Sequence, residues 1–280
     1  MRVGDLYRKV RDRFRHQGLS TPDLDARLLV SAALGLTPSE MLLHESDDAS
    51  DAAVARIDEF SKQRLAGKPV GRILGCRDFW GLEFKLNEAT LEPRPDTETL
   101  VEAVLARTPL DHAITFADIG TGSGAIAISI LTELSRTQCI AIDVSERALD
   151  CAVANAKQHG VQDRFWPVRG NYCGPLAVGF DWIVSNPPYI RTEVVRELDR
   201  EVREHDPDLA LDGGPDGLDA YRTIVAQAAE ILTEKGRIAL EIGFDQAADV
   251  SRLLQLHGFF ETEIIQDLAG MDRVLVARRG

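Results

Sequence analysis

Hydrophobic residues recur at two different spacings along this chain of 280 residues. In the first 70 residues they return every three to four positions, as at Leu6, Val10 and Phe14, which is the period of an amphipathic helix. From residue 114 onward, short apolar runs alternate with stretches of helical period. This change of pattern predicts a helical bundle followed by a domain that contains a sheet.

Helix-boundary residues refine the picture of residues 1–70. Thr21 followed by a proline has the order of an N-cap and a first helical position, and the helix that it opens should end near Gly35. Residues 37–40 have the spacing of a capping box, and Ser50 should begin a further helix. No residue set in this part is typical of catalysis. We therefore expect residues 1–70 to form a small helical domain that recognises the substrate.

Residues 71–92 differ in pattern from the parts on either side. The run from Phe79 to Phe84 alternates in hydrophobicity beside glycines, which predicts a short β-hairpin. We expect this hairpin to link the helical domain to a catalytic domain at residues 93–280.

Strands and helices should alternate through the catalytic part. The expected strands are 114–119, 139–143, 165–168, 182–185, 238–242, 259–265 and 274–277. The expected helices are 124–134, 146–158 and 246–257, together with an apolar stripe that starts at Tyr221 and should stop at Gly236. Alternation of this kind predicts an α/β fold with a Rossmann-like, doubly wound and mostly parallel sheet.

A glycine-rich loop, Asp118-Ile-Gly-Thr-Gly-Ser-Gly124, lies between the first expected strand of this part and its helix. Glycines allow a tight turn and a close approach of the backbone to a ligand. Dinucleotide sites use Gly-x-Gly-x-x-Gly, and glycines at 120, 122 and 124 do not meet that spacing. Asp118 has no role in the diphosphate pattern, but it suits a ligand whose head is an amino acid.

Asp143 ends the next expected strand, where a carboxylate can accept both hydroxyl groups of a ribose. The alternative is that Asp143 caps the helix that begins near Glu146. A glycine loop, a strand-end acid and the lack of a diphosphate pattern together point to S-adenosylmethionine. The expected cofactor contacts are Asp118, Gly120, Thr121, Gly122, Ser123, Gly124 and Asp143.

The motif Asn186-Pro-Pro-Tyr189 follows an apolar strand at 181–185. Neither proline can donate a backbone hydrogen bond, so the chain must leave the sheet in a fixed turn at the strand's carboxyl end, where open α/β sheets bind ligands. An Asn side chain can grip an amide or amino group, and Tyr189 can stack on a planar substrate. The motif predicts a site that presents a planar nitrogen to an electrophile. The alternative is a strand-ending turn with a packed tyrosine.

Composition and charge exclude several classes of protein. No apolar run approaches the roughly 20 residues that span a bilayer, and the N-terminus lacks the apolar core of a signal peptide. The four cysteines lack Cys-x-x-Cys spacing, so reduced thiols in the cytoplasm are expected, and no metal site is assigned. The net charge of −13 arises entirely after residue 70, which disfavours DNA as a substrate and suits a partner protein with a basic surface.

Taken together, these residues resemble a known family. The glycine loop with Asp143 resembles the class I methyltransferases, and Asn-Pro-Pro-Tyr is shared by members that methylate planar nitrogen. Segments that match one branch closely are 67–70, 73–75, 79–81, 91–98, 207–211, 213–214, 216–218 and 267–273. Over nearly its whole length the chain is similar to the PrmC (HemK) family, which modifies the glutamine of the Gly-Gly-Gln motif in peptide chain release factors.

The resemblance implies a reaction and a set of roles. Methyl would pass from S-adenosylmethionine to the glutamine amide nitrogen, with release factors as protein partners. The side-chain carbonyl of Asn186 and the backbone carbonyl of Pro187 would each accept one N–H of that amide, with Asn186 also next to the cofactor. Pro188 and Tyr189 would complete the slot, and Tyr189 would pack on the flat carboxamide. Three more residues would wall the site, namely Arg94, Asp96 and Glu98. The chain is expected to act as a monomer.

The sequence also departs from the family pattern. Asn171 stands where an acid is usual, and it would accept a hydrogen bond from the adenine amino group while Tyr172 packs on the adenine ring. Arg72 stands where the family often has an aromatic residue. The acidic stretch at 193–219 is expected to form a mobile cover or docking loop over the turn at Asn186, the alternative being a solvated loop.

Two other functions remain open on the sequence alone. An adenine-N6 methyltransferase acting on nucleic acid shares the turn at Asn186, but it normally needs a basic face or a base-reading domain. A cofactor-binding adaptor that has lost catalysis would have been free to lose Asn186 and Asp143. Both residues are present, which favours the enzyme.

Overall fold

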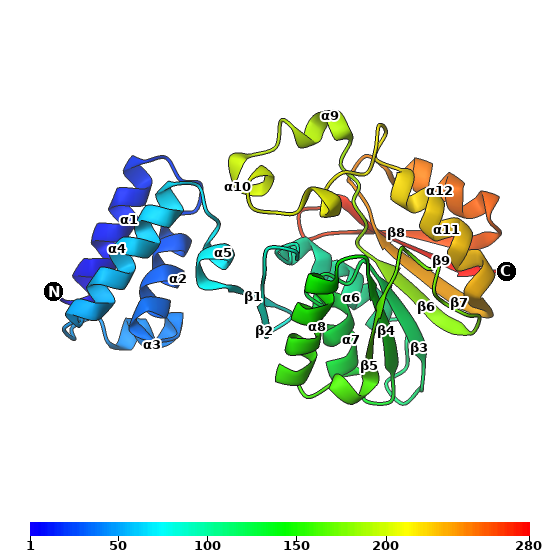
Figure 1. Cartoon of the computed structure of the whole chain (residues 1–280), viewed down its shortest axis with the longest axis horizontal. Coiled ribbons are helices and arrows are strands. Elements are labelled where there is room, and N and C mark those ends of the chain that lie inside the picture. Colours follow the sequence, from blue (N-terminus) through cyan, green and yellow to red (C-terminus); the bar gives the residue numbers. More distant parts are fainter. The chain divides into compact units, whose positions relative to one another are not determined.

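The computed structural model describes all residues from Met1 to Gly280, and the chain divides into two compact units, Met1–Gly75 and Cys76–Gly280 (Figure 1). Residues 71–75 therefore fold with the first unit and the hairpin folds with the second. No helix combines the length and the apolar character that crossing a membrane would require. Each unit has its own hydrophobic core.

The first unit is all-helical, as its hydrophobic period predicts. Its helices are α1 (Val3–His16), α2 (Pro22–Leu34), α3 (Pro38–Leu43), α4 (Asp51–Leu65) and α5 (Val70–Leu74). The residues at helical spacing on α1, which include Leu6 and Phe14, are buried against Leu29 of α2 and Ile57 of α4. Burying these stripes against one another, rather than helix propensity alone, stabilises such short helices.

The expected helix caps are mostly present. Thr37 and Glu40 form both hydrogen bonds of the capping box, and the Ser50 hydroxyl accepts the amide of Ala53. Thr21 is different, because its side chain makes no cap hydrogen bond and donates instead to Asp25 at 2.8 Å.

A buried ion pair explains the different behaviour of Thr21. The Nε of Arg64, on α4, donates to Oδ2 of Asp25 at 2.6 Å, and both side chains are almost fully buried. A buried carboxylate needs several donors, and the Thr21 hydroxyl supplies one of them. The hydroxyl is therefore used to hold α2 to α4 rather than to cap α2.

The second unit begins with the hairpin of β1 (Cys76–Phe79) and β2 (Leu82–Lys85), which lies outside the main sheet. The main sheet contains β3 (Thr115–Ile119), β4 (Gln138–Asp143), β5 (Phe165–Arg169), β6 (Phe180–Ser185), β7 (Leu232–Glu241), β8 (Phe259–Gln266) and β9 (Asp272–Arg279). Its strand order is β5-β4-β3-β6-β7-β9-β8, with the first five strands parallel and β9 antiparallel to both neighbours. The mostly parallel, doubly wound sheet that the sequence predicts is confirmed.

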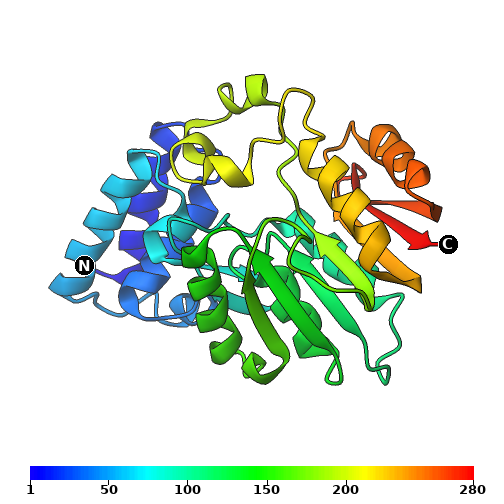
Figure 2. The ribbon, with the colours of Figure 1, turned by 45° about the vertical axis from the view of Figure 1, so that its right-hand side comes forward.

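Helices cover both faces of the sheet (Figures 1 and 2). One face packs against α6 (Glu98–Leu105), α7 (Ala125–Glu133) and α8 (Glu146–Gln158), and the other against α11 (Asp219–Ile231) and α12 (Ala247–Leu256). Successive strand residues alternate between the two cores, so Phe116 belongs to the first and Ala117 to the second. Because both faces are covered, the central strands β3 and β6 have buried residues at consecutive positions, whereas the edge strands β5 and β8 are largely exposed.

The prediction that the helix containing Tyr221 stops at Gly236 is wrong. Helix α11 ends at Ile231, and β7 starts at Leu232 and runs through Gly236. Leu232 pairs with Phe180 before the register shifts between Phe180 and Trp182, and a Cβ on Gly236 would lie 3.0 Å from both the Phe180 oxygen and the Leu232 Cβ. The glycine permits a close approach inside a strand instead of ending a helix.

Short elements fill the rest of the unit. They are η1 (Pro95–Thr97), η2 (Gln162–Arg164), α9 (Thr192–Val195), α10 (Arg200–Arg203) and η3 (Asp208–Ala210). The parallel strands all end at one edge of the sheet, and the glycine loop, Asp143, Asn186 and Glu241 stand at the ends of β3, β4, β6 and β7 respectively. This edge carries the candidate site.

Candidate active site

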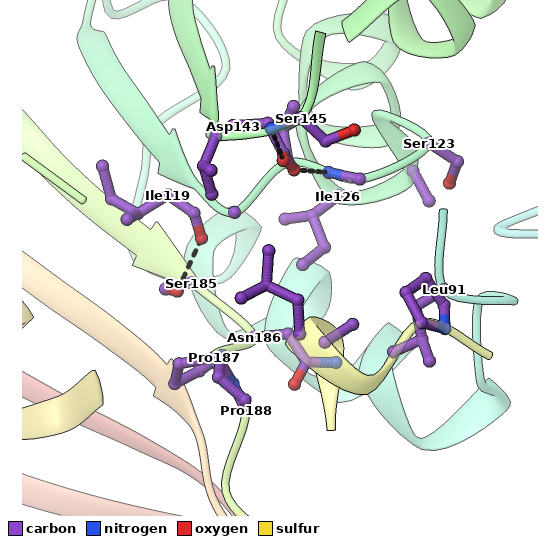
Figure 3. A pocket seen from close by; sticks show the side chains of 18 of the residues that line it. Leu91, Ile119, Ser123, Ile126, Asp143, Ser145, Ser185, Asn186, Pro187 and Pro188 are labelled. Carbon is purple, nitrogen blue, oxygen red and sulfur yellow. Dashed lines mark hydrogen bonds between the residues drawn. The ribbon is translucent and has the colours of Figure 1, made fainter. Parts of the chain in front are cut away.

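A cavity of about 270 Å³ lies at the carboxyl edge of the sheet (Figure 3). Its walls come from the segments that follow β3, β4, β5 and β6, from residues 89–97, and from residues 207–210. Figure 3 shows Asn186, Pro187 and Pro188 on one side of the cavity and Asp143 and Ser145 on the other. The predicted site residues that line it are Arg94, Gly120, Thr121, Gly122, Ser123, Asp143, Asn171, Tyr172, Asn186, Pro187 and Pro188.

The glycine loop is held tightly against β4. The amides of Gly120 and Thr121 both donate to the Ile142 carbonyl at 2.9 Å, and Gly120 and Gly122 have φ angles of 74° and 56°. These left-handed conformations favour glycine, and a Cβ on either residue would meet open space. The loop therefore presents bare backbone to the cavity.

Gly124 stands apart from the other loop glycines. It does not line the cavity, and a Cβ there would lie 2.8 Å from the Ile128 Cδ1 and 3.2 Å from the Ala152 Cβ. Its role in the structure is to let α7 begin close to α8. The prediction that Gly124 contacts the cofactor has no support from the cavity walls.

Asp143 links the glycine loop to the next helix. One carboxylate oxygen accepts the amide of Gly122 and the other accepts the amide of Ser145, each at 2.9 Å. The N-cap of α8 is Ser145, whose hydroxyl accepts the Ala148 amide. Asp143 is therefore not the cap of this helix, which was the alternative role considered for it. Burial raises the pKa of Asp143, opposed by hydrogen bonds from the backbone amides of Ser145, Gly122 and Val144. The group is placed to accept hydroxyl hydrogens from a ribose in the cavity.

Asp118 lies behind the loop rather than in the cavity wall. Its side chain is fully buried, Oδ2 accepts the Thr121 hydroxyl at 2.7 Å, and Oδ1 has no hydrogen-bond partner. Burial raises the pKa of Asp118 to about 7, opposed in part by the Thr121 hydrogen bond. A buried carboxylate oxygen without a donor, one residue before the cavity wall at Ile119, fits the ammonium group of an amino-acid ligand.

Asn186 occupies the centre of one wall. The Ser185 hydroxyl donates to the Ile119 carbonyl at 2.7 Å, which joins the ends of β6 and β3 at this point (Figure 3). The Nδ2 of Asn186 donates to the Thr97 hydroxyl at 3.3 Å, and Thr97 also lines the cavity. Since Nδ2 is used by Thr97, the carbonyl oxygen of the Asn186 side chain remains as the acceptor for a ligand.

Tyr189 does not line the cavity, although it was predicted to pack on the substrate. Its ring packs against the core cluster that contains α11, and its hydroxyl lies 3.5 Å from Oε1 of Glu241. Burial and the nearby Glu241 raise the pKa of Tyr189. The structure thus places this side chain behind the turn.

The three charged residues at 94–98 make different contacts, and only one of them lines the cavity. Arg94 lines the cavity and donates to Asp206 at 2.8 Å, which ties the wall segment 207–210 to η1. Asp96 lies 3.7 Å from Arg273, and Glu98 accepts the backbone amide of Trp80 at the hairpin turn. Asp96 and Glu98 do not line the cavity.

Several lining residues were missed by sequence reasoning. Apolar members are Ala89, Leu91, Pro93, Ile119, Ala125, Ile126, Val144, Pro207, Leu209 and Ala210, polar members are Thr97, Ser145 and Ser185, and Gly170 contributes backbone. Those directly after a parallel strand could have been inferred from strand ends alone. The segments at 89–93 and 207–210 carry no such signal, since only the tertiary structure brings them to the cavity.

Comparison with known proteins agrees with the fold and the site. Residues 5–75 match the PrmC N-terminal domain, and residues 95–202 match the methyltransferase small domain. A methyltransferase from Pyrococcus furiosus superposes with a TM-score of 0.54 at 17% identity, covering 80% of this chain and 99% of that one. The ribosomal protein L11 methylase of Lactobacillus delbrueckii subsp. bulgaricus superposes with a TM-score of 0.50 at 21% identity, covering 68% of this chain and 82% of that one. The fold and the matched domain define a class I methyltransferase that uses S-adenosylmethionine.

Relatives with similarity over the whole chain identify the family. The chain is 43% identical over 275 residues to the release factor glutamine methyltransferase of Agrobacterium fabrum, covering 96% of this chain and 94% of that protein. It is 44% identical over 271 residues to the protein of the same name from Bradyrhizobium diazoefficiens, covering 95% and 91%. The chain belongs to the release factor glutamine methyltransferase family.

Proposed function

We propose that this enzyme transfers a methyl group from S-adenosylmethionine to N5 of the glutamine in the Gly-Gly-Gln motif of peptide chain release factors, and so modulates translation termination. The observation that carries the proposal is the place of Asn186. Its amide lies in the wall of a cavity shared with the glycine loop and Asp143, and Nδ2 is bonded to Thr97. Relatives named release factor glutamine methyltransferase are similar to the chain over nearly its whole length.

The cofactor side of the cavity is formed by β3, β4 and the segment after β5. Asp143 would hold the ribose, and Asn171 and Tyr172 the adenine. Asp118, buried behind the loop, would attract the ammonium group from there. When bound, S-adenosylmethionine supplies an electrophilic methyl group on a sulfonium. The chain's own part is to hold that methyl toward Asn186 and to keep water away through the apolar walls at Leu91 and Ile126.

The substrate side is formed by the turn at Asn186. An amide nitrogen is a weak nucleophile because its lone pair is delocalised into the carbonyl. The Asn186 side-chain carbonyl and the Pro187 backbone carbonyl would each accept one N–H of the substrate amide, which directs the nitrogen at the methyl and stabilises its developing positive charge. Bound S-adenosylmethionine would supply the methyl group to this nitrogen and leave as S-adenosylhomocysteine, while the two carbonyls would hold the amide until its extra proton is lost to solvent. Pro188 limits the slot to a flat carboxamide.

The remaining parts of the chain would contribute to recognition of the release factor. We propose that the helical domain expected at 1–70 recognises the substrate, that the segment expected at 71–92, which contains α5 and the hairpin β1–β2, links the domains, and that residues 93–280 carry out catalysis. The net charge of −13 suits a protein partner with a basic surface rather than a nucleic acid. We further propose that the enzyme acts as a monomer in the cytoplasm, where its free cysteines stay reduced.

Methyl transfer to defined acceptors tests the proposal. The protein is incubated with methyl-labelled S-adenosylmethionine and either a release factor, the same factor with its Gly-Gly-Gln glutamine changed to alanine, or duplex DNA. Label is expected only on the intact glutamine. Asn186→Ala should lower kcat by about 10² to 10³-fold, while cofactor binding measured by calorimetry persists.

Three results would contradict the proposal. Label on DNA alone would show an adenine methyltransferase, and label on the alanine variant would show a different acceptor. Absence of label on every acceptor, with intact cofactor binding, would show an adaptor without catalysis.

A further inference from the structure

The C-terminal end of the Asn186–Tyr189 turn is held by a side chain that has no part in the reaction described above. Gln246, the residue that precedes α12, is 6% exposed. Its Nε2 donates to the Tyr189 carbonyl at 3.0 Å and to the Gly217 carbonyl at 3.2 Å. Its Oε1 accepts the amide of Gly243 at 3.0 Å. Backbone groups from three separate segments therefore satisfy this buried polar side chain.

These three hydrogen bonds leave the Gln246 amide only one orientation. A flip by 180° would bring its oxygen against two carbonyl oxygens and its NH2 group against the N–H of Gly243. The backbone is fixed as well, because the Gln246 amide donates to the Gly243 carbonyl at 2.9 Å and α12 begins at the next residue. The side chain is therefore a rigid donor aimed at the end of the turn.

The turn itself can make few backbone hydrogen bonds. Pro187 and Pro188 have no N–H to donate, and their rings fix φ at about −65°. The direction of the carbonyl groups in the turn therefore depends on how its two ends are held. At the first end, the Ser185 hydroxyl joins β6 to the end of β3 at 2.7 Å. At the second end, Gln246 holds the carbonyl of Tyr189.

A glycine segment packs against the turn at the same place. A Cβ on Gly213 would lie 2.7 Å from the Pro188 oxygen and 2.9 Å from the Tyr189 Cα. A Cβ on Gly217 would lie 2.7 Å from Nε2 of Gln246 and would also clash with the Tyr189 carbonyl. Only residues without side chains allow this close approach. Gln246 joins the segment to the turn, because its Nε2 is shared by Gly217 and Tyr189.

We propose that Gln246 is a positioning residue, which holds the Tyr189 carbonyl and thereby fixes the Pro187 carbonyl toward the substrate amide. The inference rests on the role proposed above for the turn. A substrate nitrogen held by both carbonyl acceptors faces the methyl group, whereas one held by Asn186 alone can swing away from it. Loss of the Gln246 donors should therefore lower the rate of methyl transfer more than the affinity for either substrate. Cofactor binding should not change, because Gln246 does not line the cavity.

Gln246→Met tests this role, because it nearly keeps the length of the side chain and removes both donors. We expect kcat for methylation of a release factor to fall by about 10 to 100-fold, with KM for the release factor changed less than about threefold. Kd for S-adenosylmethionine, measured by calorimetry, should stay the same. Leu254→Ala is the matched control, since Leu254 is fully buried about two turns further along α12. It should lower thermal stability but leave kcat unchanged below the melting temperature.

A second pair of variants disturbs the same contact without changing Gln246. Gly217→Ala places a methyl group between Nε2 of Gln246 and the Tyr189 carbonyl, and the φ of 77° at this position adds backbone strain. Gly258→Ala carries similar strain at a φ of 81°, but a Cβ there meets nothing within 4 Å. Gly217→Ala should therefore show the same fall in kcat as Gln246→Met, whereas Gly258→Ala should keep the wild-type kcat.

A wild-type kcat in Gln246→Met would overturn the inference, and so would an equal fall in kcat in Leu254→Ala, which would show a general effect of lost stability. A raised Kd for S-adenosylmethionine with unchanged kcat would also overturn it. If Gln246→Met does not fold, the comparison of Gly217→Ala with Gly258→Ala decides. Failure of this inference is distinct from failure of the proposed function, because only in the second case does the wild type leave the release-factor glutamine unmethylated.

Discussion

Asp143 combines two tasks in one carboxylate. Its two oxygens accept the amides of Gly122 and Ser145, so the same group fixes the glycine loop and the start of α8 while it faces the cavity. Charge-assisted hydrogen bonds of this kind hold their donors more firmly than neutral ones. The loop is therefore shaped before a ligand arrives, which lowers the ordering cost of binding.

Replacing Asp143 by alanine should weaken cofactor binding. The change would remove the proposed ribose contacts and release the Gly122 amide, so we expect Kd for S-adenosylmethionine to rise by about 10 to 100-fold. Calorimetry with the purified variant measures this. Glu146→Ala is the matched control, because Glu146 is a neighbouring acid that does not line the cavity. Equal affinities for Asp143→Ala and wild type would remove Asp143 from the cofactor site.

Residue-level prediction from sequence succeeds where the signal is local. The place of Asn186 follows from a strand that ends in two prolines, and the place of Asp143 from the end of the preceding strand. The direction of the Tyr189 ring does not follow, because it depends on Glu241 of β7, which is 52 residues away in the sequence. Thr97 was missed as a cavity residue for the same reason, because it lies 89 positions from Asn186 in the sequence and meets it only in the folded chain.

At the level of elements, the start of α7 depends on one glycine. Gly124 has a φ of 81°, and its missing Cβ leaves room for Ile128 and for Ala152 of α8. Two helices on one face of the sheet can therefore approach each other closely at the loop. The position of the loop backbone in the cavity depends on this contact.

Gly124→Ala should destabilise the second unit by roughly 2–3 kcal/mol, from backbone strain together with a steric clash. Gly160→Ala is a suitable control, because Gly160 also has a positive φ, of 68°, but a Cβ there would meet nothing within 4 Å. It should cost only about 1 kcal/mol. Urea denaturation compares the two. Equal losses for both variants would show that packing against α8 adds nothing to the strain.

Element boundaries show which signals are decisive. Helix α8 has the expected bounds, Glu146–Gln158, because a serine cap and an apolar stripe are both local features. The boundary between α11 and β7 was wrong because Leu232 continues the apolar stripe of the helix, yet its backbone pairs with Phe180 of β6. Pairing between distant segments overrides a local period.

On the scale of the whole molecule, burial of two carboxyl groups affects stability. Asp118 and Glu241 are both almost fully buried, and the pKa of each is raised to about 7. A carboxyl group whose pKa is higher in the folded state binds its proton more tightly there than in the unfolded chain. The stabilisation is complete below the unfolded pKa, near 4, and is lost as the pH rises through about 7.

Asp118→Asn should remove much of this dependence in the cofactor-free protein. Between about pH 4 and pH 8, the wild type should lose on the order of 3–4 kcal/mol of unfolding free energy relative to the variant. Urea denaturation at several pH values gives the difference between the two proteins. A difference that stays constant with pH would mean that Asp118 titrates normally in the folded state.

The two units of the chain differ in the spacing of their hydrophobic residues. A helical period in the first part and alternation in the second distinguish the two units, because each period reports which face of an element is buried. The separation falls after Gly75, so the short helix α5 joins the first unit and the hairpin joins the second. The sequence could not show this, since a helix as short as α5 has no clear periodicity.

The position of β9 has a consequence for biosynthesis. This strand comes after every other strand in sequence, yet it lies inside the sheet between β7 and β8. While the chain is being made, β7 must wait with one edge open, and an open edge of apolar strand invites pairing with other chains. Arg273, which contacts Asp267 and lies near Glu241, also arrives with β9. The sheet beside β7 is therefore completed last, and we expect a nascent chain that stops short of β9 to be prone to aggregate.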